Sequence, residues 1–326
     1  MDFRSLTMLI LLSSLAAFQS VQAAVQSISA NESSDDSTLA EVQEVLGQDE
    51  DDDEPLRFIK PNPKKLKIRS RTAIVVDYRE GRILYAKAID KKTPIASITK
   101  LMTAMVTLDA HLALDELIDV SWDDVDRIKR SRSRVDIGSR LSRLQLMELA
   151  LIASDNRAAF ALSRTYPGGA DAFVAAMNTK ARQLKMRNSV FSDATGLNRK
   201  NVSTARDLVL LVNAAYGYPL IREITSQPEQ VVVPENFHDE ISILNTNRLI
   251  RAQTWDIGLS KTGYIRESGH CLVMQADVNR RPLIIVLLNA SRKKQKFEDA
   301  RRIRDWLIRA EMRADHQNLK PALAKK

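Results

Sequence analysis

The chain is poor in several residue types, and each scarcity narrows its function. One cysteine among 326 residues excludes the internal disulfide framework that stabilises many small secreted modules. The ten glycines form neither G-x-G-x-x-G nor G-x-x-x-x-G-K-[ST], so a glycine-rich nucleotide site is not expected. The four histidines lie in neither H-E-x-x-H nor H-x-x-E-H, and no G-x-S-x-G occurs. We therefore predict no metal, no other cofactor and no Ser-His-Asp hydrolase.

Charge is unevenly distributed along the chain. Residues 32–54 hold eleven acids and no lysine or arginine, whereas residues 1–31 hold one base and one acid. The rest of the chain, residues 55–326, therefore holds 48 bases and 29 acids, a net charge of +19 that the overall +8 conceals. Such a basic body predicts a polyanionic partner, whether nucleic acid, an anionic membrane or a cell-wall polymer.

The N-terminus selects among these partners. Arg4 precedes an apolar stretch at 6–18, and residues 21–23 (Val-Gln-Ala) match a signal-peptidase pattern that places cleavage after Ala23. The apolar stretch is shorter than the ~20 residues that a bilayer span needs, and a buried N-terminal helix is the alternative. We predict a signal peptide at 1–23 and an exported protein of the periplasm. Nucleic acid is then not a partner, and membrane association is at most peripheral.

Composition sets the remaining domain limits. Residues 24–67 are rich in Ser, Asp, Glu and Gln and poor in aromatic residues, which is typical of a disordered acidic linker. Apolar periodicity starts near Ile68 and continues to about residue 312, which predicts one folded domain at 68–312. We expect residues 313–326 to form a short basic tail, and its last part, 319–326, has no wide apolar face.

Strand patterns enclose a helical middle within that domain. Residues 72–77 and 83–88 flank a turn that contains Gly81, as in a β-hairpin, and Thr93-Pro94 is a typical helix start. Further helices are predicted at 141–153, 156–164, 170–184 and 204–215. Late strands are predicted at 230–233, 241–244, 259–265, 271–277 and 282–289, followed by a closing helix at 297–312. This order predicts an α+β domain with an antiparallel sheet lobe and an all-helical lobe.

The first candidate for catalysis is Ser97-Ile-Thr-Lys100, at the start of the first predicted helix. Residues three apart share a helix face, so the Ser97 hydroxyl and the Lys100 amine can meet. The helix dipole stabilises an alkoxide near a helix N-terminus, and burial beside other cations lets a lysine lose its proton near neutral pH. The pattern is common, and alone it indicates no more than a serine at a helix start.

Two further motifs make a catalytic role for the first one the favoured interpretation. Ser154-Asp155-Asn156 lies between two predicted helices, where Asp155 is expected to be a solvated linker residue. Lys261-Thr-Gly opens a predicted strand. The three motifs in this order are those of penicillin-binding proteins and β-lactamases.

On these motifs the chain resembles the serine D-Ala-D-Ala peptidases of family S11, the low-molecular-mass penicillin-binding proteins. The similarity extends to residues 191–197 and 201–208. Residues 166–169 and 269–274 are similar to the D-alanyl-D-alanine endopeptidase branch, of the penicillin-binding protein 7 type. The resemblance implies a β-lactamase/transpeptidase-like fold with the active site between the sheet lobe and the helical lobe.

The resemblance also implies the catalytic roles. Ser97 would be the nucleophile that takes the D-alanyl acyl group, and Lys100 would be its general base. Ser154, with Lys261 near its hydroxyl, would relay a proton to the leaving amine. The backbone N–H groups of Ser97 and Tyr264 would form the oxyanion hole.

The implied substrate-binding residues are Asn156, Lys261, Thr262, Gly263 and Tyr264. Asn156 would hydrogen-bond either the substrate amide or Lys100. Lys261 and Thr262 would bind the substrate carboxylate, since a fixed cation and a hydroxyl donor suit that group.

The implied function is hydrolysis of D-alanyl–diaminopimelyl cross-links through an acyl-enzyme, with peptidoglycan peptide stems as substrate and β-lactams as inhibitors. A class A β-lactamase is disfavoured, because no glutamate lies between Glu148 and Glu223 to hydrolyse the acyl-enzyme. A D-alanyl-D-alanine carboxypeptidase is an alternative; the 63 residues after Gly263 leave no room for the second domain that many of those enzymes carry. A non-catalytic wall-binding protein is the third alternative, which the three intact motifs disfavour.

For the single cysteine and for one basic run, we favour a structural interpretation over a functional one. Cys271 lies in an apolar strand and is expected to be a buried structural thiol rather than a nucleophile. The basic run 127–134 is expected to be a solvated loop, and contact with anionic groups of the cell wall is its functional alternative.

Overall fold

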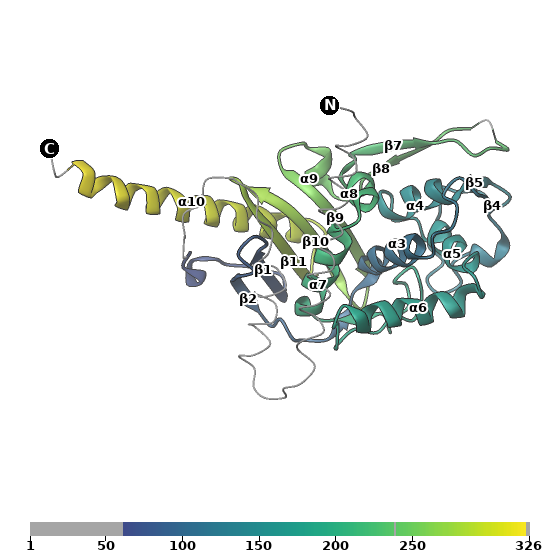
Figure 1. Ribbon diagram of the computed structural model, residues 1–326, viewed down its shortest axis with the longest axis horizontal. Coiled ribbons are helices and arrows are strands. Elements are labelled where there is room, and N and C mark those ends of the chain that lie inside the picture. Colours follow the sequence, from purple (N-terminus) through teal and green to yellow (C-terminus); the bar gives the residue numbers. More distant parts are fainter. Residues whose placement is uncertain (1–60, 238, 324–326) are drawn as a thin grey trace, which may run out of the picture.

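One lobe of the molecule is built on a five-stranded antiparallel sheet (Figure 1). The computed structural model describes residues 61–237 and 239–323, so the predicted signal peptide and nearly all of the predicted linker lie outside the described residues. The strands lie in the spatial order β2-β1-β11-β10-β9. Their bounds are β1 Thr72–Asp77, β2 Ile83–Lys87, β9 Asp256–Ile265, β10 Gly269–Val278 and β11 Arg281–Ala290.

Both faces of this sheet are covered, because apolar side chains alternate to either side of its central strands. Ile74 and Val76 of β1 belong to the core that the helical lobe completes, whereas Ala73 and Val75 belong to a second core. The helix α10 (Gln295–Leu323) closes that second core with Phe297 and four further buried residues: Ala300, Ile303, Trp306 and Leu307. The sheet is therefore buried on both faces, and its edge strand β9 lies on the side of the helical lobe.

The other lobe is helical and lies to the right in Figure 1. Its helices are α3 Thr99–Asp109, α4 Arg143–Leu151, α5 Asn156–Arg164, α6 Gly169–Gln183, α7 Ala205–Tyr216 and α8 Pro219–Ser226; a single turn, α9 Arg248–Arg251, precedes β9. Side-chain caps fix the helix starts: Ser142 and Gln145 form a capping box on α4, and Asp155 accepts the Ala158 backbone N–H on α5. The Asp155 cap fixes the second motif where α4 and α5 meet.

Short elements connect the two lobes and extend the helical one. The two-residue strands β3 (Thr93–Pro94) and β6 (Val202–Ser203) pair with each other, as do β4 (Leu117–Asp119) and β5 (Arg140–Ser142). The strands β7 (Glu229–Val232) and β8 (Ile241–Leu244) form a separate ribbon. Single 3₁₀ turns are η1 Pro63–Lys65, η2 Ala96–Ile98 and η3 Trp122–Asp124. No helix in the described ranges is both long enough and apolar enough to cross a membrane.

The structure corrects two sequence predictions. Thr93-Pro94 does not begin a helix, because Thr93 pairs with Ser203 in β3 and the Ile95 N–H bonds to the Asn201 carbonyl; helical structure starts only at η2. The predicted strands at 230–233 and 241–244 pair only with each other and do not enter the main sheet. Local patterns indicate strand character but not the partner that a strand selects.

Candidate active site

Ser97 and Lys100 lie together where η2 runs into α3. The Lys100 side chain is fully buried, and its Nζ lies 2.7 Å from Asn156 Oδ1, 2.9 Å from the Thr195 carbonyl oxygen and 3.1 Å from Ser97 Oγ. The first two sequence motifs therefore meet at one lysine nitrogen. Of the two contacts predicted for Asn156, the structure shows the one with Lys100.

The surroundings of Lys100 favour its neutral form. Burial lowers the pKa of Lys100 from 10.5 to about 8, an effect that the carboxylates of Asp193, Asp155 and Asp126 partly offset. A lysine with this pKa is partly deprotonated at neutral pH. It can therefore accept a proton, as a general base must.

The hydrogen-bond partners of Lys100 determine where its lone pair points. A neutral amine has two hydrogens and one lone pair. Asn156 Oδ1 and the Thr195 carbonyl oxygen can only accept hydrogen bonds, so they take both hydrogens. The ammonium form donates its third hydrogen to Ser97 Oγ; once Lys100 has lost that proton, its lone pair faces Ser97 Oγ. The geometry thus suits transfer of the Ser97 hydroxyl proton to Lys100.

Two glycines let the backbone close around Ser97. A Cβ on Gly263 would lie 2.9 Å from the Ile95 carbonyl oxygen and 3.1 Å from Ser97 N, so β9 runs directly against η2. A Cβ on Gly196, whose φ is +84°, would lie 1.9 Å from the Ala96 carbonyl oxygen. Ala96 itself has a φ of +50°, a conformation that costs roughly 1–3 kcal/mol in a non-glycine residue. Such strain clusters at functional sites, here beside the predicted nucleophile.

The second motif differs in part from its prediction. Ser154 has a φ of +61°, a second strained position, and among the described residues its side chain has no hydrogen-bond partner, Lys261 included. Asp155 is not a solvated linker residue. It is buried, because it caps α5 and its two carboxylate oxygens accept hydrogen bonds from the Ser133 hydroxyl at 3.0 and 2.9 Å.

The third motif places a second buried lysine beside the first. Lys261 is 1% exposed on β9, and burial, together with the charges of Lys100 and Lys296, lowers its pKa well below 10.5. In the described part of the chain its Nζ has one hydrogen bond, a long one of 3.4 Å to the Thr262 carbonyl oxygen. Tyr264, three residues after Lys261, is 57% exposed and stacks on His270. The strand β9 thus places a buried cation, in the third motif, and an exposed aromatic ring, directly after it, three residues apart.

Residues that the sequence motifs missed complete the site: Asp193, Thr195, Ser131 and Asp126. Asp193 Oδ1 accepts the backbone N–H groups of Thr195 and Gly196, both at 2.6 Å, and so holds the turn whose carbonyl binds Lys100. Ser131 accepts a hydrogen bond from Asn156 Nδ2 at 2.8 Å and donates one to Asp126 at 2.6 Å. The 191–197 stretch was visible only as a family similarity, and no motif signalled Ser131 or Asp126.

The basic run 127–134 borders this site. Its backbone is anchored at one end by Asp126 and at the other by Asp155, which accepts the Arg134 N–H. An ion pair of 2.6 Å between Lys129 and Glu267 links the run to the turn between β9 and β10. The four arginines of the run are exposed: Arg127, Arg130, Arg132 and Arg134. The run is therefore a solvated loop, as expected, and it is held in place.

Comparisons with known proteins identify the family. The family model for D-alanyl-D-alanine carboxypeptidases of the Peptidase S11 type matches residues 59–292. The chain belongs to this family. It is 45% identical over 245 residues to a D-alanyl-D-alanine endopeptidase of Pseudomonas aeruginosa, covering 75% of this chain and 79% of that protein. It is 43% identical over 240 residues to a D-alanyl-D-alanine endopeptidase of Escherichia coli, covering 74% and 77%.

Solved structures agree with this S11 assignment. The Streptomyces K15 DD-transpeptidase superposes with a TM-score of 0.69 at 26% identity, covering 74% of this chain and 98% of that one. The predictions of an α+β, β-lactamase/transpeptidase-like fold and of a serine D-Ala-D-Ala peptidase of family S11 are confirmed.

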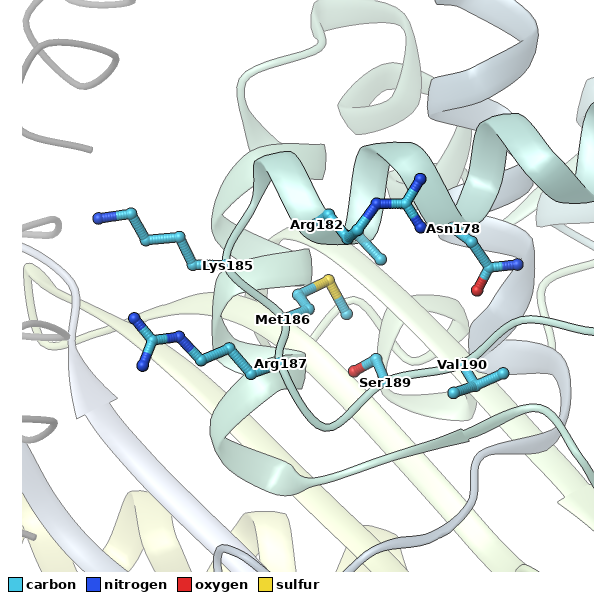
Figure 2. Close-up of a pocket in the computed structure, with 8 residues that line it drawn as sticks. Asn178, Arg182, Lys185, Met186, Arg187, Ser189 and Val190 are labelled. Atoms are coloured by element: carbon cyan, nitrogen blue, oxygen red, sulfur yellow. The ribbon is translucent and has the colours of Figure 1, made fainter. Parts of the chain in front are cut away.

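Two other features of this S11 domain lie outside the Ser97 site. Cys271 is buried as predicted, and burial raises the pKa of its thiol, which disfavours the thiolate. A cavity of about 470 Å³ lies where α6 ends, and Figure 2 shows Lys185 and Arg187 at its border, extending in the same direction. None of the residues lining this cavity belongs to the three motifs.

Proposed function

We propose that the protein is a serine D,D-endopeptidase that hydrolyses D-alanyl–diaminopimelyl cross-links in peptidoglycan. The observation that carries this proposal is the contact set of Lys100, in which two acceptors direct the lone pair of the neutral amine toward Ser97 Oγ. The relatives at 43–45% identity, both D-alanyl-D-alanine endopeptidases, support the choice of substrate.

Acylation begins with proton transfer. Lys100 removes the hydroxyl proton of Ser97 as Oγ attacks the carbonyl carbon of the D-alanyl residue. The developing oxyanion accepts hydrogen bonds from the backbone N–H groups of Ser97 and Tyr264. The proton then passes by way of Ser154 to the leaving amine as the C–N bond breaks, which leaves an ester on Ser97.

Deacylation reverses these proton movements. Water attacks the ester carbonyl and loses its proton to Lys100, and Ser97 Oγ leaves with a proton. Lys261 and Thr262 hold a substrate carboxylate, and Gly263 lets β9 lie close enough to η2 for the oxyanion donors to converge. A β-lactam enters the same acylation step and forms an ester that resists water, so β-lactams are inhibitors.

A D-alanyl-D-alanine carboxypeptidase is the second candidate, because the family description and relatives at 26–29% identity carry that name. The mature protein should be incubated with sacculi and the released muropeptides separated by chromatography. Loss of dimers is the expected result. Loss of terminal D-alanine from monomers with dimers intact would identify the carboxypeptidase, and no Ser97-dependent change would leave only wall binding.

The exported state completes the proposal. We propose cleavage after Ala23, a linker at 24–67, a catalytic domain at 68–312, a basic tail at 313–326 and a periplasmic location with at most peripheral membrane contact. The structure shows order at both borders of that division, since η1 lies within the linker range and α10 continues through residue 323. The exposed arginines beside the site suit an anionic polymer such as peptidoglycan. N-terminal sequencing of the protein from a periplasmic fraction tests this: a mature chain that begins at Ala24 is expected, and an intact Met1 would contradict it.

A further inference from the structure

A short chain of hydrogen bonds runs from the basic loop to the predicted base. Asn156 Nδ2 donates to Ser131 Oγ at 2.8 Å, and Ser131 Oγ donates to Asp126 Oδ2 at 2.6 Å. On its other side, Asn156 Oδ1 accepts from Lys100 Nζ at 2.7 Å. Three hydrogen bonds, through the side chains of Ser131 and Asn156, thus link a buried carboxylate to the lysine that faces Ser97.

We propose that Asp126 and Ser131 are positioning residues that set which way the Asn156 amide faces, and thereby aim the lone pair of Lys100 at Ser97. The proposal rests on the proposed function only in that Ser97 and Lys100 act as nucleophile and base. Neither positioning residue touches Ser97.

The direction of each hydrogen bond follows from the chemistry of the groups. An ionised carboxylate has only acceptor sites, so the hydrogen between Asp126 and Ser131 must be the single hydroxyl hydrogen of Ser131. Toward Asn156, Ser131 can then only accept. Asn156 must therefore turn its NH₂ group to Ser131, which leaves its oxygen facing Lys100.

Asp126 is held in the ionised form that this direction requires. Burial alone would raise the pKa of Asp126, but hydrogen bonds from the Ser131 hydroxyl and from the backbone N–H groups of Ile128, Lys129 and Ser131 outweigh it. The net effect lowers the pKa of Asp126 below its usual value. The carboxylate thus remains an acceptor at neutral pH.

The opposite orientation of the amide would disable the base. If Asn156 turned its NH₂ group toward Lys100, that group would donate to the lone pair of the neutral amine. A hydrogen of Lys100 would then point at Ser97 Oγ, and the lysine could not accept the serine proton. The orientation of one amide therefore decides whether the Ser97–Lys100 pair can react.

The loop contains a natural control for this proposal. Ser133 donates to the Asp155 carboxylate at 3.0 and 2.9 Å, so it anchors the same loop through the same kind of bond. Unlike Ser131, it makes no hydrogen bond to Asn156. Ser131→Ala and Ser133→Ala each remove one hydroxyl that anchors the loop, but only Ser131→Ala frees the amide of Asn156.

The first test compares the acylation rates of these variants with fluorescent penicillin. We expect Ser131→Ala to acylate roughly 10- to 100-fold more slowly than the unchanged protein. Ser133→Ala should remain within about threefold, and Ser131→Thr, which restores the hydroxyl, should recover most of the rate. An equal loss in Ser131→Ala and Ser133→Ala, or no loss in Ser131→Ala, would overturn the proposal. Thermal unfolding of each variant shows that the fold is retained.

The second test uses Asp126→Asn and the pH dependence of acylation. Burial lowers the pKa of Lys100, and the carboxylates of Asp193, Asp155 and Asp126 raise it. The neighbouring cation is Lys261, whose own pKa is lowered by the charge of Lys100. Removing the Asp126 charge while keeping its shape should lower the maximal rate and move half-maximal acylation to lower pH. If the substitution merely loosened the loop, water would reach Lys100 and half-maximal acylation would move to higher pH. That result would contradict the proposal.

Failure of this inference can be told apart from failure of the proposed function. If Ser97→Ala still forms a stable penicillin adduct, the proposed mechanism itself is wrong. If Ser97→Ala forms none but Ser131→Ala acylates normally, the mechanism stands and only the positioning role is lost.

Discussion

The two lysines of the site are both buried, yet their surroundings differ. Lys100, on the helical side, lies within hydrogen-bond distance of three oxygens that come from three separate segments of the chain. Lys261, on the sheet side, has within the described residues one long hydrogen bond of 3.4 Å to a carbonyl oxygen. Burying an ammonium is costly, and it is more costly with few hydrogen-bond partners than with a full set of acceptors.

This difference in surroundings indicates different roles for the two lysines. The acceptors around Lys100 are complete before any substrate binds, as preorganised proton transfer requires. The environment of Lys261 is incomplete, so an anionic substrate group would supply what the protein does not. We infer that the helical side is organised for chemistry and the sheet side for binding a carboxylate.

The largest expected effect comes from breaking the helical side. Ser97→Ala should abolish penicillin labelling because no oxygen remains to form the ester. Lys100→Ala should reduce the acylation rate by roughly 10²- to 10⁴-fold, the contribution of a positioned general base. Mass spectrometry of the intact protein after exposure to penicillin measures both adducts. Cross-link cleavage by either variant at the normal rate would contradict the assigned roles.

A substitution of Lys261, on the sheet side, should have an intermediate effect on the acylation rate. Its effect on the unfolding temperature should also differ from that of a Lys100 substitution. Lys261→Met should slow acylation by substrates that carry a carboxylate by roughly 10- to 100-fold, the value of a charged hydrogen bond. Because it also removes a poorly partnered buried cation, its unfolding temperature should be equal to or above that of the unchanged protein.

Lys100→Met is the matched control. It leaves Asn156 Oδ1 and the Thr195 carbonyl oxygen without their donor, so it should unfold at a lower temperature than Lys261→Met. Calorimetry measures the unfolding temperature of both variants. Equal destabilisation would mean that the two lysines are not held differently.

The smallest effect on acylation is expected at the loop that borders both sides. Arg130→Glu with Arg132→Glu should leave the rate of penicillin acylation within about twofold, because neither guanidinium contacts Lys100 or Ser97. The same change should weaken sedimentation with sacculi through charge repulsion. Arg301→Glu with Arg309→Glu, on the exposed face of α10, alters the net charge equally and is the control. Equal weakening by both pairs would show that the loop has no special part in wall binding.

Local sequence signals predicted the elements better than their arrangement. The bounds of α5, β1 and β8 match the predicted ranges because caps, turns and alternation are properties of neighbouring residues. The Thr93-Pro94 helix start failed because pairing with β6, more than a hundred residues later, outweighed a local preference.

The site shows the same limit. Side-chain motifs brought Ser97, Lys100 and Asn156 to attention, and the structure joins them. Thr195 could not be found in that way, because it contributes a backbone carbonyl that any residue could supply. Ser131 reaches Asn156 from a loop whose composition indicated only solvation.

The central claim is that neutral Lys100 is the base for Ser97. Its most direct test is the second-order rate of acylation of the unchanged protein by a fluorescent penicillin between pH 6 and 10. Because the pKa of Lys100 is lowered to about 8, the neutral fraction rises with pH, and the rate should rise about tenfold per unit below pH 8 and level off above it. A rate that is independent of pH across that range, or that falls as the pH rises toward 8, would contradict the account.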